Sequence, residues 1–149
     1  ERENGAMDGI LLAPVTPAAL FWGKWLGNVT LVLAVEAIAV PLWMIFFNVE
    51  PTPRIFGVAA IVVLATVGFT APGTLFAAMA VRTRFAELLL PVLLLLFVIP
   101  PLFFAAQATV RLLGAAPMSD LAGWLRLLAL YDLAFLTLAT MLFPAVIDQ

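Results

Sequence analysis

Four long apolar runs follow one another after residue 28, and they leave few folds open to this chain. A helical span of a bilayer needs about 20 mostly apolar residues, and runs of that kind extend over about residues 29–47, 55–81, 88–106 and 124–147. The sequence is 65% hydrophobic and 11% charged, against about a half and a quarter in a soluble domain. The sequence therefore predicts an all-α membrane protein, a polytopic helical bundle that forms a single domain over residues 1–149.

The composition excludes several kinds of chemistry. The chain has no cysteine and no histidine, which rules out disulfides, thiolate metal sites and Ser-His-Asp catalysis. Its formal net charge of -2 gives no basic surface for nucleic acid. Gly23-Lys24 is followed by Trp25 and has no upstream glycine, so a phosphate-binding loop is absent. We expect no catalytic, cofactor or metal site, and we expect any ATP to be bound by another subunit.

Three short links join the predicted spans, at residues 48–54, 82–87 and 107–123, and they leave no room for a soluble domain. An even number of spans places both ends of the chain on one side. Arg82 and Arg84 cluster in one tight turn on that side, which the positive-inside rule makes cytoplasmic. Pro100-Pro101 is expected to end the third helix or to begin a re-entrant piece before residue 123.

Residues 1–28 form the polar surface before the first span. Met7, Ile10, Leu11 and Pro14 follow the spacing of one helix face, so we expect a short surface helix that ends at Pro14. Membrane-anchoring helices are typically basic, whereas this segment has three acidic residues and one basic residue at positions 1–8. The acidity favours a protein partner, and simple anchoring in the bilayer is the alternative.

A second helix is expected to begin directly after that break. Thr16 has the side chain of an N-cap, and Pro17 suits the first helical position. We therefore expect this helix to run from Pro17 straight into the first span.

Two carboxylic acids lie inside predicted spans. Glu36 is about 10 Å deep and Asp132 about 12 Å deep from the opposite side, at 1.5 Å per residue. In a core about 30 Å thick their depths differ by roughly 8 Å, so we expect no shared-proton pair. Each acid is either a polar lining or proton site, or a hydrogen-bonded packing residue.

The second span contains residues that weaken a helix. Gly68, Thr70, Pro72 and Gly73 interrupt it, which indicates a kink or a close approach of another helix. A broken helix that forms a substrate site is the alternative.

Several segments, in order, resemble one family of membrane proteins. The beginning, ERENGAMDGILLAPVTPAALFWGKWLGN, resembles a glutamate-rich E-x-E-x-G segment that leads to a Gly-Lys pair in the CcmB family. These proteins are the permease subunits of the cytochrome c maturation (haem exporter) ABC transporter. Further matches are GFTAPGTLFAAMAVRTR, ELLLPVLLLLFVIPPLFFAA and LLALYDLAFLTLATMLFPAVID, so the resemblance covers essentially the whole chain.

This resemblance implies an architecture and a docking segment. The family has six spans, so the chain is similar to the last four, and its first residues correspond to a cytoplasmic loop. In ABC exporters of this architecture that loop forms the coupling helix that docks on the ATPase. The resemblance thus implies ATPase contacts by Glu1, Glu3, Gly5, Asp8, Leu11, Leu12 and Pro14.

The resemblance also implies partners and a location. The partners would be a CcmA-like ATPase, a CcmC-like haem-handling protein, a CcmD-like small subunit and a second copy of the chain. The chain itself would be a multi-pass protein of the bacterial inner membrane. Haem would be the handled ligand. Because the chain has no histidine or cysteine, we expect a partner to ligate the iron. The alternatives are an ABC-2-type permease that exports a lipid or polysaccharide, and a membrane assembly subunit without transport activity.

Overall fold

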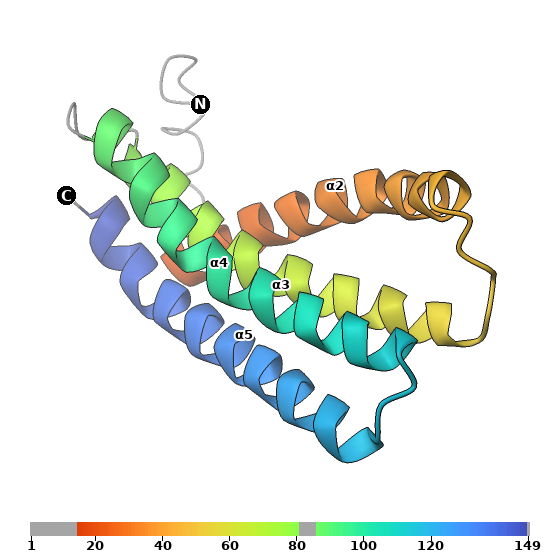
Figure 1. Cartoon of the computed structure of the whole chain (residues 1–149). Helices are drawn as coiled ribbons and strands as arrows, with labels where there is room; N and C mark the ends of the chain where they lie inside the picture. The colour runs from red at the N-terminus through yellow and green to blue at the C-terminus, as the bar shows by residue number, and fades with distance from the viewer. Residues whose placement is uncertain (1–14, 81–85, 149) are drawn as a thin grey trace.

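The structure is a computed structural model that describes residues 15–80 and 86–148. Within them the chain forms four long helices, each long and apolar enough to cross a membrane. The prediction of an all-α polytopic membrane protein is therefore confirmed. The helices, in chain order, are α2 (Pro17–Phe46), α3 (Arg54–Ala80), α4 (Ala86–Leu113) and α5 (Met118–Ile147), as Figure 1 shows.

Helix α2 begins where the sequence predicted. The Thr16 hydroxyl accepts a hydrogen bond from the backbone N–H of Ala19 at 3.3 Å, and Pro17 occupies the first helical position. The helix then continues without a break to Phe46, although Pro41 lies inside it. Thus one continuous helix carries the chain from Pro17 through the first span.

Helix α3 is the centre of the bundle. It packs against α2, α4 and α5, whereas α2 and α4 do not touch each other. The start of α2 lies against the end of α5, where the rings of Phe21 and Phe143 are 5.3 Å apart. The start of α2 and the end of α5 therefore lie at the same end of the bundle (Figure 1).

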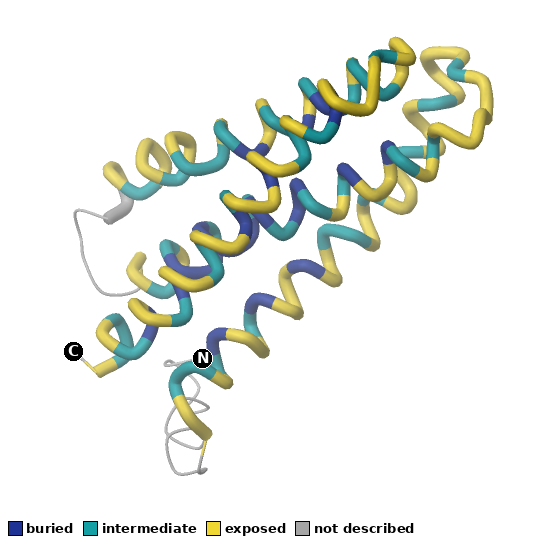
Figure 2. Tube along the Cα trace, turned by 90° about the horizontal axis from the view of Figure 1, so that it is seen from below, coloured by how far each residue is buried: buried dark blue, intermediate teal, exposed yellow. Residues whose placement is uncertain are grey.

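Small residues allow the helices to approach closely. One buried cluster joins α2, α3 and α5 around Ala71 and Ala139, and a second joins α3, α4 and α5 around Ala65, Ala105 and Ala108. In lipid, helix association depends on such close packing because the bilayer is as apolar as the side chains. Figure 2 shows that the buried positions face the inside of the bundle, while long outer faces stay exposed.

The prediction that Pro100-Pro101 ends the third helix is wrong. Helix α4 continues through both prolines to Leu113, and the link to α5 is only residues 114–117. Pro101 has no N–H, so the carbonyl of Phe97 loses its helical donor. The hydroxyl of Tyr131 on α5 donates to that carbonyl instead. The helix is therefore maintained by a bond from its neighbour, and no re-entrant piece forms.

Replacing Tyr131 by phenylalanine tests this account. We expect the bundle to lose about 1–2 kcal/mol, because the Phe97 carbonyl would be left unpaired in an apolar setting. Thermal unfolding in lipid or detergent measures the loss. In a Pro101→Ala background the helical N–H returns, so Tyr131→Phe should then cost little; an equal loss in both backgrounds would contradict the assigned role.

Candidate functional site inside the helical bundle

The expected ATPase-contact residues lie outside the part of the chain that the structure describes. These are Glu1, Glu3, Gly5, Asp8, Leu11, Leu12 and Pro14. Their roles remain predictions. The described part of the candidate site consists of the polar groups within the helices.

Three threonines form a polar stripe on α3. Thr66, Thr70 and Thr74 are spaced by four residues, so their side chains lie on one face of the helix. Each hydroxyl donates to the carbonyl four residues earlier, over 3.0 Å from Thr66, 2.6 Å from Thr70 and 2.8 Å from Thr74. We call these residues the threonine ladder.

Helix α2 supplies a partner to each residue of the threonine ladder. The indole N–H of Trp25 donates to Thr70 over 3.1 Å, and the amide of Asn28 donates to Thr74 over 2.9 Å. The Thr66 hydroxyl lies 2.8 Å from both carboxylate oxygens of Glu36. Three polar contacts therefore join α2 to α3, and Glu36 has the kind of partner that a hydrogen-bonded packing residue needs.

We predict that Glu36→Gln leaves function largely intact. The glutamine amide can donate a hydrogen bond to the Thr66 hydroxyl, as the side chains of Trp25 and Asn28 donate to the other two threonines. Glu36→Leu, which keeps the volume but removes the bond, is the matched comparison and should lower thermal stability by about 0.5–1.5 kcal/mol. A Glu36→Gln variant that inserts well but loses the function of the wild-type chain would overturn the packing role.

The threonine ladder was not among the features predicted from the sequence. Its signal was present as three threonines at four-residue intervals in one apolar run. Serine and threonine commonly bond to the carbonyl four residues earlier in a helix, so the spacing alone does not show which neighbouring helix provides donors.

Asp132 on α5, unlike Glu36, has no polar partner in the described structure. Its side chain is buried, with 5% of its surface exposed, and neither carboxylate oxygen has a hydrogen-bond partner among the described residues. It lies against Gly68 of α3 and near Pro101 of α4, so tightly that a Cβ on Gly68 would overlap an Asp132 oxygen. Of the two structures predicted around Gly68, the close helix approach is therefore confirmed, and α3 itself continues through Pro72.

The two acids do not form a pair, as predicted. Glu36 contacts Thr66, whereas Asp132 contacts Gly68 and has no hydrogen-bond partner in the described structure. Thr66 and Gly68 are two positions apart, which is about 200° around α3 and about 3 Å along its axis. The acids therefore approach α3 from different sides. The α3 residues that the two acids contact are about 3 Å apart along the helix axis, less than the depth difference of roughly 8 Å that the sequence predicted.

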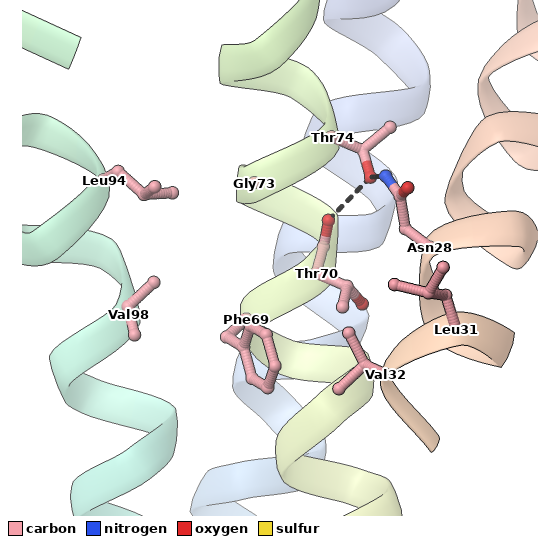
Figure 3. Close-up of a pocket in the computed structure, with 9 residues that line it drawn as sticks. All are labelled: Asn28, Leu31, Val32, Phe69, Thr70, Gly73, Thr74, Leu94 and Val98. Atoms are coloured by element: carbon pink, nitrogen blue, oxygen red, sulfur yellow. Dashed lines mark hydrogen bonds between the residues drawn. The ribbon is translucent and has the colours of Figure 1, made fainter. Parts of the chain in front are cut away.

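A groove of about 250 Å³ lies between α2 and α4, with α3 as its floor. Figure 3 shows its walls, with the Asn28–Thr74 hydrogen bond at one edge and apolar side chains from both outer helices facing inward. Such a groove can hold an apolar group, but among its lining residues only Asn28, Thr70 and Thr74 offer polar atoms. The lining residues are Asn28, Leu31, Val32, Phe69, Thr70, Gly73, Thr74, Leu94 and Val98.

The described helices contain no group of three or more acidic, histidine or cysteine residues that is able to hold a metal ion. The hydrogen-bonding side chains of the described site are the two acids, the Asn28 amide, the Trp25 indole and the hydroxyls of the threonine ladder.

Together, these features define a multi-pass helical membrane protein with polar contacts between its spans. A family match makes the class specific: the profile described as "CcmB protein" matches residues 1–149, so the chain belongs to the CcmB family. The members are permease components of the ABC transporter for cytochrome c maturation, as the resemblance in the sequence implied. No curated protein and no solved structure matches the chain.

Proposed function

We propose that this chain is the permease subunit of a bacterial inner-membrane ABC complex that supplies haem to the periplasm for c-type cytochromes. The observation that carries this proposal is the family match over the whole of residues 1–149. Four helices that can cross a membrane support the permease role.

Helix α2 has the connections that a moving element of such a permease needs. The proposed ATPase-contact segment, residues 1–14, leads directly into the cap at Thr16, and α2 is unbroken from Pro17 to Phe46. A displacement of that segment is therefore transmitted to the whole helix. Because α2 contacts α3 and α5 but not α4, its movement would change the width of the groove between α2 and α4.

The partners follow from the chemistry that this chain lacks. ATP would be bound by a CcmA-like ATPase at residues 1–14, and two copies of the chain would face two ATPase subunits. Iron ligands would come from a CcmC-like haem-handling protein, because the sequence has neither histidine nor cysteine. A CcmD-like small subunit would complete the complex. Haem is thus a handled ligand in this proposal and not a resident cofactor.

Deletion and rescue test the proposed substrate. Cells without this chain are expected to lose holo-cytochrome c and to recover it when the haem-loaded periplasmic chaperone is provided. Co-purification with an ATPase is expected as well. Defects in envelope lipid or polysaccharide with normal cytochromes would instead favour the lipid exporter, and the absence of any ATPase partner would favour an assembly subunit.

Charge reversal tests the ATPase contact. Glu3→Lys together with Asp8→Lys should uncouple ATP turnover from cytochrome maturation without preventing membrane insertion, because the segment would become basic and would repel a partner surface that complements acidic residues. Glu50→Lys, in the turn between α2 and α3 at the other end of the bundle, is the matched control and should be neutral. Unchanged complex assembly and ATP turnover in the double variant would contradict the docking role.

A further inference from the structure

Asp132 has neither a hydrogen-bond partner nor an ion-pair partner in the described structure. On its own helix Tyr131 donates to Phe97, and Arg126 lies six positions earlier. On α4, Arg111 is bonded to Gln107 and stacked on Trp124. On α3, the nearest ionisable residue in sequence to Gly68 is Arg54 at the helix start, and on α2 Glu36 is engaged with Thr66. No cation therefore balances a charge on Asp132.

No hydrogen-bond donor among the described residues reaches either carboxylate oxygen of Asp132. Pro72 lacks an N–H, so the carbonyl of Gly68, the residue that Asp132 touches, has no helical donor. An ionised carboxylate is only an acceptor and has nothing to accept here, whereas a protonated carboxyl has one O–H to donate. The surroundings thus complement the protonated form.

The seam between α3, α4 and α5 leaves no room for another ligand at this position. Both oxygens of Asp132 are buried. A single Cβ added to Gly68 would overlap Asp132 and come within 3.0 Å of the Cβ of Pro101. A metal ion or a water molecule needs more space than this gap provides, so a proton is the only cation that fits.

We propose that Asp132 is a proton-binding site that is occupied while α5 is packed on α3 and is emptied when the two helices separate. While the helices are apart, a hydronium ion donates a proton to the carboxylate and leaves as water. The O–H bond then persists in the closed seam, where a charge would have neither water nor a counter-ion. When α5 moves away, water reaches the carboxyl, accepts the proton and stabilises the carboxylate. Proton occupancy and helix packing are thereby linked. Only the cause of the movement, ATP turnover in a partner, rests on the proposed function.

Infrared spectroscopy of the full chain in lipid bilayers tests the proton itself. Wild type at neutral pH is expected to show the C=O stretch of a protonated carboxyl, with a shift on deuteration. Asp132→Asn should remove that component, whereas Asp120→Asn, at an exposed acid of the same helix, should not. A spectrum in which Asp132→Asn removes only a carboxylate band would overturn the proposal.

Paired spin labels test the link to helix separation. The chain has no cysteine, so labels at Ala77→Cys on α3 and Met141→Cys on α5, both exposed positions, attach only there. Raising the pH should increase the population with a longer α3–α5 distance in wild type, and Asp132→Asn should abolish that response. A pH-independent distance in wild type, or an equal response in the variant, would overturn the linkage. Neither measurement uses haem or cytochrome, so a wrong substrate assignment would leave both results unchanged.

Discussion

Replacing Gly68 by alanine is expected to destabilise the bundle by about 1–3 kcal/mol and to lower holo-cytochrome c yield with it. The new methyl group would overlap an oxygen of Asp132 and would lie 3.0 Å from the Cβ of Pro101. Neither neighbour can yield easily, because the Asp132 oxygens are buried and Pro101 is part of a rigid ring in α4. Thermal unfolding in lipid or detergent measures the change.

A second glycine of the same helix provides the matched control. A Cβ at Gly73 would find only Leu94 at 3.9 Å, which is ordinary contact. Gly73→Ala should therefore be neutral or stabilising by up to about 1 kcal/mol, since alanine is the better helix former. If Gly68→Ala and Gly73→Ala have the same effect, close packing at Gly68 is not what determines stability here.

A double variant separates the two contacts at Gly68. Asp132→Ala removes the overlapping oxygen but leaves Pro101 in place, so it should relieve part of the cost of Gly68→Ala. Additive effects of the two substitutions would contradict the contact between these residues.

The number and type of helices were predictable because they depend on local properties. Hydrophobic length alone identifies the spans, since a chain in lipid must satisfy its backbone within each helix. The start of α2 was also predictable, because Thr16 and Pro17 act on the turn that they begin.

The path of α4 was not predictable from its own residues. Two adjacent prolines ordinarily end a helix, and the group that compensates for Pro101 is Tyr131, thirty positions later on another helix. A sequence read segment by segment does not reveal such a donor.

Part of the candidate site was predictable from the sequence and part was not. Glu36 and Asp132 could be selected from the sequence, because an ionisable side chain inside a membrane costs free energy and therefore needs an explanation. Glu36 has a hydrogen-bond partner in Thr66, whereas Asp132 is buried without one. This difference depends on how α2 and α5 are placed around α3. The four-residue spacing of the threonine ladder is visible in the sequence. Its partners are known only from the structure, which places Trp25 and Asn28 against it.

Replacing Thr70 by valine is expected to have the second large effect, a loss of about 1–2 kcal/mol together with reduced cytochrome maturation. Valine has nearly the same shape but no hydroxyl, so the buried indole N–H of Trp25 would lose its acceptor. Because Thr70 also lines the groove and helps to join α2 to α3, the substitution weakens the attachment of the helix that we propose to move. Thermal unfolding and holo-cytochrome c yield measure the two effects.

Two comparisons make the Thr70 result specific. In a Trp25→Phe background no indole N–H needs an acceptor, so Thr70→Val should cost markedly less than in wild type. Thr137→Val removes a hydroxyl that is exposed and donates only within its own helix, over 2.7 Å to Leu133, and it should change stability by less than about 0.5 kcal/mol. A Thr70→Val cost that is the same with tryptophan or phenylalanine at position 25 would show that the interhelical bond contributes little. The attachment of α2 would then depend on apolar packing around Phe21 and on the two other polar contacts, those of Asn28 and Glu36 with α3.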